Sequence, residues 1–229
     1  MNAGSVELPA NLFDRVDETP DALFYGVPRL VTHIDDATIA ALTDYYREAL
    51  SPGGDILDVM SSWVSHLPSE MEFGRVAVLG MNAQELAAND RATETVVHDL
   101  NADPKLPYQP ESFDAVTNAV SVQYLVNPVA VFASIRRVLR PGGVSIVAMS
   151  HRCFPTKAVR AFHTLPPKGR FDLVSRYCEL AGGFDRIEHI DRSPDSADPL
   201  WIVSARRAGP HRDAVDRSSS RNRSSTDEL

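Results

Sequence analysis

Side chains suited to acid–base chemistry or to ligand binding come directly after several short apolar runs of the sequence. Asp58 comes near the end of one such run, Asp99 follows another, and His151 follows a third. His151 is the best acid/base candidate among them, because an imidazole changes its charge near neutral pH. Cys153 has little support as a nucleophile, because the sequence assigns it no activating partner.

A second group of such side chains lies near the N-terminus, where Tyr25, Arg29 and His33 stand four residues apart. Arg29 can pair with a ligand carboxylate through two parallel hydrogen bonds, or it can form an ordinary surface salt bridge. The adjacent acids Asp35 and Asp36 precede a helical pattern, and such acids are typical of helix caps rather than metal ligands. We therefore expect no metal site.

The stretch after Asp58 holds hydroxyl, indole and imidazole groups. Ser61 and Ser62, at the start of a predicted helix, can present hydroxyl and backbone N–H groups to a carboxylate, or they can be plain N-caps. Trp63 and His66 would then lie one turn apart and face one cavity, unless Trp63 belongs to the core.

The hydrophobic pattern predicts the elements that position these side chains. Between residues 55 and 207, apolar β-type runs alternate with helical patterns, which is typical of a parallel sheet with helices on both faces. The predicted strands are Asp55–Met60, Arg75–Leu79, Thr95–His98, Phe113–Ala119, Val144–Met149, Asp185–Ile190 and Leu200–Ala205. The predicted helices run from Asp35 through Ala49, from Ser62 to before Gly74, from Asn82 to Ala88, from Asn127 to Leu139, and from Phe171 to Leu180. The short link between the last two strands predicts an antiparallel hairpin.

Composition limits the kind of protein. The chain has 229 residues, with 31 acidic and 23 basic side chains and a formal net charge of -8. This balance argues against nucleic-acid binding, which depends on Lys and Arg neutralising phosphates. No apolar run approaches the ~18 residues of a membrane span, and the two cysteines fit a reducing compartment. We expect a cytoplasmic protein with a small-molecule partner and without nucleic-acid or membrane partners.

Three parts of the chain are expected to differ in organisation. Residues 1–50 form an N-terminal segment with a covering helix, and residues 51–207 form the main α/β domain. Residues 208–229 are rich in serine, arginine and acids, almost without large apolar side chains, and are expected to be disordered.

Residues 55–207 resemble the class I S-adenosylmethionine-dependent methyltransferases, particularly the type 11 branch. The resemblance rests on Ile56-Leu57-Asp58, on Leu106-Pro107-Tyr108 with Ser112-Phe113-Asp114-Ala115-Val116, and on Val138-Leu139-Arg140-Pro141-Gly142-Gly143. It implies a Rossmann-like, seven-stranded, mostly parallel sheet whose last strand is antiparallel. It also implies S-adenosylmethionine as cofactor, bound at the carboxyl ends of the first three strands.

The chain departs from the family at two cofactor-binding positions. The family's first strand leads into a loop with three glycines, and Met60, Ser62 and Val64 stand at those positions here. Without glycine, the loop must either take ordinary φ angles or hold the ligand further away. Gly80 stands where the family carries an acid for the ribose hydroxyls, whereas Asp99 matches the family's contact to the adenine amino group.

The resemblance also implies roles for individual side chains. Asp58 corresponds to an acid near the methionine amino group, and Gln123 or Tyr124 is expected to line the substrate side. The predicted cofactor-binding residues are Arg29, Asp58, Met60, Ser61, Ser62, Gly80, Met81, Asn82, Asp99, Leu100 and Asn101. The predicted substrate-binding residues are Tyr25, His33, Trp63, His66, Gln123 and Arg152, and the predicted catalytic residues are Tyr124 and His151.

The leading hypothesis is therefore a methyltransferase with an atypical cofactor loop, acting on a small molecule. The alternative is a catalytically inactive binding or scaffolding protein on the same fold, which the replaced glycines favour. A nicotinamide-dependent oxidoreductase is disfavoured because the chain has no G-x-G-x-x-G motif.

Overall fold

The computed structural model describes residues 8–209. Of the expected disordered tail, residues 210–229 lie outside the described residues. No helix within the described part is long and apolar enough to cross a membrane.

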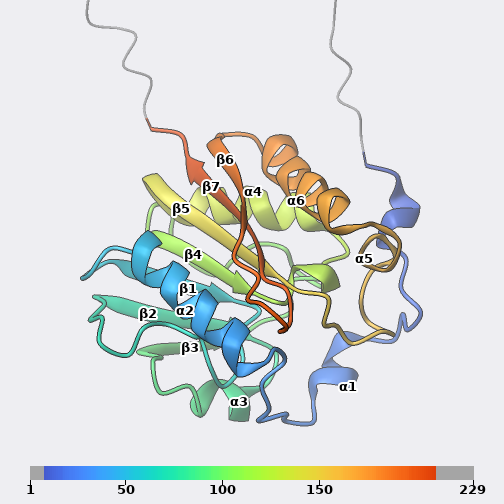
Figure 1. The fold of residues 1–229 in the computed structure, drawn as a ribbon, viewed down its shortest axis with the longest axis horizontal. Coiled ribbons are helices and arrows are strands. Elements are labelled where there is room, and N and C mark those ends of the chain that lie inside the picture. Colours follow the sequence, from blue (N-terminus) through green and yellow to red (C-terminus); the bar gives the residue numbers. More distant parts are fainter. Residues whose placement is uncertain (1–7, 210–229) are drawn as a thin grey trace, which may run out of the picture.

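The core of the fold is one seven-stranded sheet in the order β3-β2-β1-β4-β5-β7-β6 (Figure 1). Its strands are β1 (Asp55–Val59), β2 (Arg75–Gly80), β3 (Glu94–Val97), β4 (Phe113–Ala119), β5 (Leu139–Met149), β6 (Phe184–Asp191) and β7 (Trp201–Arg207). Strands β1 to β5 pair in parallel, and β7 is antiparallel to both β5 and β6. The predicted strands, the terminal antiparallel hairpin and the Rossmann-like fold class are confirmed.

Helices cover both faces of this sheet, as Figure 1 shows. On one face, α4 (Pro128–Val138) and α6 (Pro167–Ala181) bury their apolar stripes against the sheet. On the other face, α2 (Asp36–Ala49) buries Leu42 and Tyr46 completely. The predicted cap of α2 is confirmed, because the Asp35 side chain accepts a hydrogen bond from the Thr38 backbone N–H at 2.9 Å.

The remaining elements are short and lie around the sheet. They are the 3-10 helices η1 (Ala10–Phe13) and η2 (Val122–Tyr124) and the helices α1 (Asp21–Tyr25), α3 (Ala83–Ala87) and α5 (Arg160–Thr164). The predicted irregular stretch 151–168 is interrupted by α5, and α6 begins four residues before the predicted start at Phe171. The turn predicted at residues 140–143 ends α4 but belongs to β5, where Gly142 takes a φ of +81°.

The predicted helix from Ser62 to Gly74 was wrong, because residues 61–74 form an irregular segment. Pro68 disfavours a helical conformation at the residue before it and has no N–H to donate. His66 takes a left-handed φ of +55°. The segment is held by a side chain instead, because the Asn89 amide donates to the Ser62 carbonyl at 3.1 Å and to Ser65 Oγ at 2.8 Å. Ser61 and Ser62 are therefore not at a helix N-terminus.

Candidate active site

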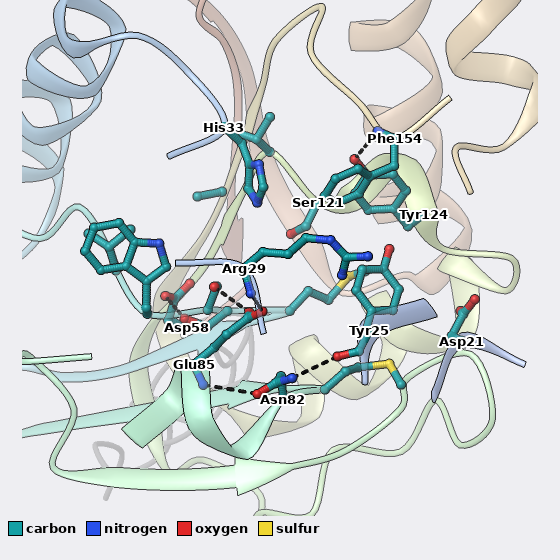
Figure 2. A pocket seen from close by; sticks show the side chains of 18 of the residues that line it. Asp21, Tyr25, Arg29, His33, Asp58, Asn82, Glu85, Ser121, Tyr124 and Phe154 are labelled. Atoms are coloured by element: carbon teal, nitrogen blue, oxygen red, sulfur yellow. Dashed lines mark hydrogen bonds between the residues drawn. The ribbon is translucent and has the colours of Figure 1, made fainter. Parts of the chain in front are cut away.

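A cavity lies at the carboxyl ends of β1, β2, β3 and β4, under the N-terminal segment that contains α1 (Figure 2). This is where the strand order reverses, the usual ligand position in open α/β sheets. The empty volume is about 1140 Å³ including the open mouth. Fifteen of the predicted site residues line it: Tyr25, Arg29, His33, Asp58, Met60, Ser61, Ser62, Trp63, His66, Met81, Asn82, Asp99, Leu100, Asn101 and Tyr124.

Asp58 lies at the end of β1 and is almost fully buried. Its carboxylate accepts hydrogen bonds from Ser61 Oγ at 2.5 Å and from Thr117 Oγ1 at 3.2 Å. Burial outweighs these bonds and raises the pKa of Asp58 to about 6. A cationic group in the cavity would favour the ionised form and restore an ordinary pKa.

The loop after β1 crosses over the end of β2. Met60, at the first glycine position of the family pattern, takes a φ of +55°, so the left-handed backbone persists without glycine. The Ser61 N–H donates to the Leu79 carbonyl at 2.8 Å. A Cβ at Gly80 would come within 2.2 Å of the Ser61 carbonyl oxygen. The backbone of Ser61 therefore stands against the position from which the family's ribose-binding acid would project, and Gly80 itself does not line the cavity.

Glu85 on α3 is the acid that lines the cavity beside this crossing. Its carboxylate accepts from the Arg29 backbone N–H at 2.6 Å and from Ser62 Oγ at 2.7 Å. The Asn82 side chain caps α3 and also donates to the Tyr25 carbonyl at 3.0 Å. The sequence analysis missed Glu85, although a capped helix that starts directly after β2 places its first turn at the cavity edge.

Asp99 and Asn101 lie in the turn after β3. Asp99 Oδ1 accepts from the backbone N–H groups of Asn101 and Ala102 at 2.9 and 3.3 Å. Its other oxygen has no hydrogen bond within residues 8–209. The Asn101 side chain donates to Asp21 at 2.8 Å and to the Tyr124 carbonyl at 2.9 Å, and so joins the turn to two other cavity walls.

Buried charges anchor the N-terminal segment that covers the cavity. Lys157 is completely buried, and its Nζ donates to the Thr19 carbonyl at 2.6 Å and lies 3.2 Å from Asp21 Oδ1. Arg15 pairs with the same Asp21 carboxylate at 2.8 Å. Trp63 Nε1 donates to the Val31 carbonyl at 3.0 Å. Trp63 thus contributes a contact to this segment from the irregular loop rather than from a helix.

Two polar atoms in the cavity wall are buried and without a hydrogen-bond partner in the described structure, namely His66 Nδ1 and Ser121 Oγ. Burial, with a smaller contribution from His33, lowers the pKa of His66 to about 4. His66 is therefore neutral near pH 7. A buried polar atom without a partner is costly, and a bound ligand can supply the missing bond.

Aromatic rings form the wall next to β4 and β5. Tyr124 and Phe154 stack with ring centroids 5.7 Å apart, and the Phe154 N–H donates to the Tyr124 hydroxyl at 2.8 Å. Tyr25 and His33 meet these rings edge-on. Phe154 and Ser121 are cavity residues that the sequence analysis did not select, although both lie in stretches adjacent to selected residues.

Besides Gly80, three predicted site residues do not line the cavity: Gln123, His151 and Arg152. His151 and Arg152 instead bind the Asp198 carboxylate, at 3.1 and 2.9 Å. Asp198 also bonds to the backbone and side chain of Asp35, so these contacts fix the start of α2. Gln123 is buried and donates to the Val120 and Arg152 carbonyls. The structure gives these three side chains partners within the protein, and none of the three lines the cavity.

Residues 64–147 match the family model described as the type 11 methyltransferase domain. This part of the chain is similar to a methyltransferase domain. The match begins at Val64, the last of the three replaced glycine positions, and ends within β5, so Met60 and Ser62 lie outside it. No curated protein matches the sequence.

Solved structures support the class I methyltransferase fold. The 4+2 cyclase SpnF aligns with a TM-score of 0.59 and 16% identity, over 80% of this chain and 90% of that one. An S-adenosylmethionine-dependent methyltransferase from Mesorhizobium loti aligns with a TM-score of 0.51 and 18% identity, over 73% and 98%. Phosphoethanolamine N-methyltransferase 2 of Haemonchus contortus, with S-adenosyl-L-methionine, aligns with a TM-score of 0.54 and 15% identity, over 75% and 52%. At these identities the likeness concerns the fold alone.

The residues of the cavity fit S-adenosylmethionine, the cofactor of that family. Asp58, Glu85 and Asp99 are three acids spaced along the cavity from β1 to the turn after β3. The unpartnered His66 Nδ1 and Ser121 Oγ lie in the same cavity. The exception is position 80, where the family carries an acid. Here the Ser61 backbone leaves no room for any side chain, and the residue is Gly80.

Proposed function

We propose that the protein is an S-adenosylmethionine-dependent methyltransferase that acts on a small molecule, and that it binds the cofactor through its glycine-less loop. The observation that carries this proposal is the cavity at the switch point of the sheet, lined by the acids Asp58, Glu85 and Asp99. The cofactor, when bound, supplies a methyl group on a positively charged sulfur.

The three acids have distinct places in the proposed binding mode. Asp99 has an oxygen free of the turn and would accept from the adenine amino group. Glu85 would take the ribose hydroxyls in place of the acid missing at Gly80. A carboxylate has about four acceptor positions, and the two bonds to Arg29 and Ser62 leave room for more. Asp58 would receive the amino group of the methionine part.

Methyl transfer requires mainly alignment of donor and acceptor, with the proton of the acceptor removed where it has one. His33 is suited to remove it, because it lines the cavity and burial lowers the pKa of its imidazole, which is therefore neutral at pH 7. Tyr124 is not suited, because burial raises its pKa to about 12. We assign Tyr124 a positioning role, through its hydroxyl bond to the Phe154 backbone.

A second candidate is a protein of the same fold that does not transfer methyl groups. The Ser61 carbonyl against Gly80 favours it, because an expected cofactor contact is absent. The name of SpnF also shows that a protein of this fold can be called a cyclase.

Methyl transfer is tested by incubating the full chain with methyl-labelled S-adenosylmethionine and the small-molecule fraction of a cell extract. The proposal predicts label in a new small molecule, and a large decrease with the Asp99→Ala variant. Cofactor binding without any labelled product would support the second candidate.

A further inference from the structure

The Arg29 side chain is the cationic group of the cavity that carries no counter-charge in the described structure. Figure 2 shows it extending across the pocket, with its guanidinium beside Tyr25 and Tyr124. Its Nη2 donates to the Phe24 carbonyl at 3.0 Å and its Nη1 to the Val27 carbonyl at 3.3 Å. No carboxylate within residues 8–209 forms an ion pair with it. A guanidinium has five N–H donors, so at least two remain for a ligand.

Two aromatic rings contact this guanidinium, which is half-buried. Its central carbon lies 4.5 Å from the centroid of the Phe24 ring and 5.4 Å from that of Phe154. Such stacking fixes the plane of the guanidinium, and partial desolvation strengthens its bonds to an anion. Arg29 thus presents a planar, oriented pair of donors to the cavity.

The rings beside this guanidinium follow other strands than two of the acids assigned to the cofactor, whereas the third acid, Glu85, binds the Arg29 backbone N–H. Asp58 and Asp99 follow β1 and β3, whereas the rings beside the guanidinium belong to residues after β4 and β5, namely Tyr124 and Phe154. Ser121, which follows β4, is 7% exposed, and its Oγ lines the cavity without a partner in the described structure. The Arg29 guanidinium and the Ser121 hydroxyl therefore both have donors available for a ligand, close to the rings of Tyr124 and Phe154.

Resting on the proposed methyltransferase function, we propose that the acceptor is a small carboxylic acid with an apolar or aromatic body, whose carboxylate binds Arg29. The charge of the site favours a carboxylate over a phosphate. His66 is neutral near pH 7, and Asp58 and Glu85 are acids, so Arg29 balances one negative charge and not two. The rings of Tyr25, Tyr124 and Phe154 supply the surface for the apolar body.

The test uses calorimetric titration of the full chain, with and without S-adenosylhomocysteine, with benzoate, 4-hydroxybenzoate and cinnamate. The corresponding neutral amides serve as controls for the ligand charge. We expect the acids to bind more tightly than their amides, and Arg29→Gln to weaken acid binding about tenfold or more. Arg160→Gln is the matched control, since Arg160 is exposed and lies outside the cavity, and it should change nothing.

Three results would overturn the inference: no binding of any acid at millimolar concentration, equal binding of acids and amides, or weakening of S-adenosylhomocysteine alone by Arg29→Gln. The last would assign Arg29 to the cofactor carboxylate instead. Titrations without S-adenosylhomocysteine report on the acid site even if the cofactor does not bind, so failure of the proposed function remains distinguishable.

Discussion

The Ser61 carbonyl oxygen lies so close to Gly80 that a Cβ on Gly80 would approach it to 2.2 Å. The loop after β1 therefore leaves no room for the acid that the family carries after β2. The loop with Met60 and Ser61 crosses the end of β2, and only glycine leaves space for it. The acid next to this crossing is Glu85, one helix turn into the following element.

Restoring the family's acid with Gly80→Asp should therefore damage the protein. The new Cβ would displace the Ser61 backbone, and overpacking of this kind costs about 1–3 kcal/mol. We expect the melting temperature to fall by about 5 °C and cofactor binding to decrease. Differential scanning calorimetry measures the first effect, and an unchanged melting temperature with improved binding would contradict this interpretation.

Glu85→Gln should weaken S-adenosylhomocysteine binding about tenfold, because hydrogen bonds to a charged acceptor contribute about 1.5–3 kcal/mol. Gln84→Ala is the matched control, since Gln84 is the exposed neighbour on α3 and does not line the cavity. Calorimetric titration measures both variants. Equal affinity of Glu85→Gln and the unaltered chain would show that Glu85 does not contact the ribose.

Asp58 should make cofactor binding depend on pH. Its pKa of about 6 means that the free protein carries a proton there below pH 6, whereas a ligand amino group requires the carboxylate. Affinity should be constant above pH 6 and fall by about tenfold per pH unit below it. Titrations between pH 5 and 8 measure this, and Asp58→Asn should bind weakly at every pH.

Asp58 should also make the stability of the protein depend on pH, but in the opposite direction: raising the pH favours cofactor binding and disfavours folding. Unfolding lowers the pKa of Asp58 to about 3.9, so between pH 4 and 6 the folded state binds more protons and its stability falls as pH rises. Asp58→Asn keeps a partner for both hydroxyls and should be more stable than the unaltered protein at pH 7, on the order of 2 kcal/mol. The difference should vanish at pH 4. Urea unfolding at pH 4 and pH 7 measures both differences. A variant that is less stable than the unaltered protein at pH 7 would contradict the prediction.

Lys157→Met should loosen the segment that covers the cavity. Removing one partner of a buried charge cluster costs about 3–5 kcal/mol, and Asp21 would keep only Arg15 as its cation. Amide exchange around residues 17–25 should accelerate more than exchange in the sheet. Lys168→Met is the control, because its ion pair with Asp172 is exposed and contributes at most about 1 kcal/mol. Uniform acceleration throughout the chain would contradict an anchoring role.

The sequence predicted the sheet well because its apolar runs are long and their boundaries carry strong signals. Asn82 and Asp35 cap helices as expected, and the hairpin of β6 and β7 follows from its short link. The segment from residue 61 to 74 was predicted as a helix, because local periodicity outweighed Pro68 and could not reveal the bonds that Asn89 makes to it.

The sequence allowed Asp58 and Asp99 to be placed at the cavity, because both stand at the ends of predicted strands. The sequence could not show which side chains are bound by residues from distant segments of the chain. His151 follows β5 as expected, but Asp198, 47 residues later, takes its side chain. Glu85 lines the cavity but was not predicted, because its partners Arg29 and Ser62 come from two loops far from α3 in the sequence.

The central claim is that this protein binds S-adenosylmethionine in this cavity although its loop lacks the family's glycines. The most direct measurement is calorimetric titration of the full chain with S-adenosylhomocysteine at pH 7.5. The account predicts saturable binding of one molecule per chain, with a Kd on the order of 1–100 µM, and its loss in Asp99→Ala. Absence of binding at about 1 mM, or equal binding by Asp99→Ala, would contradict it.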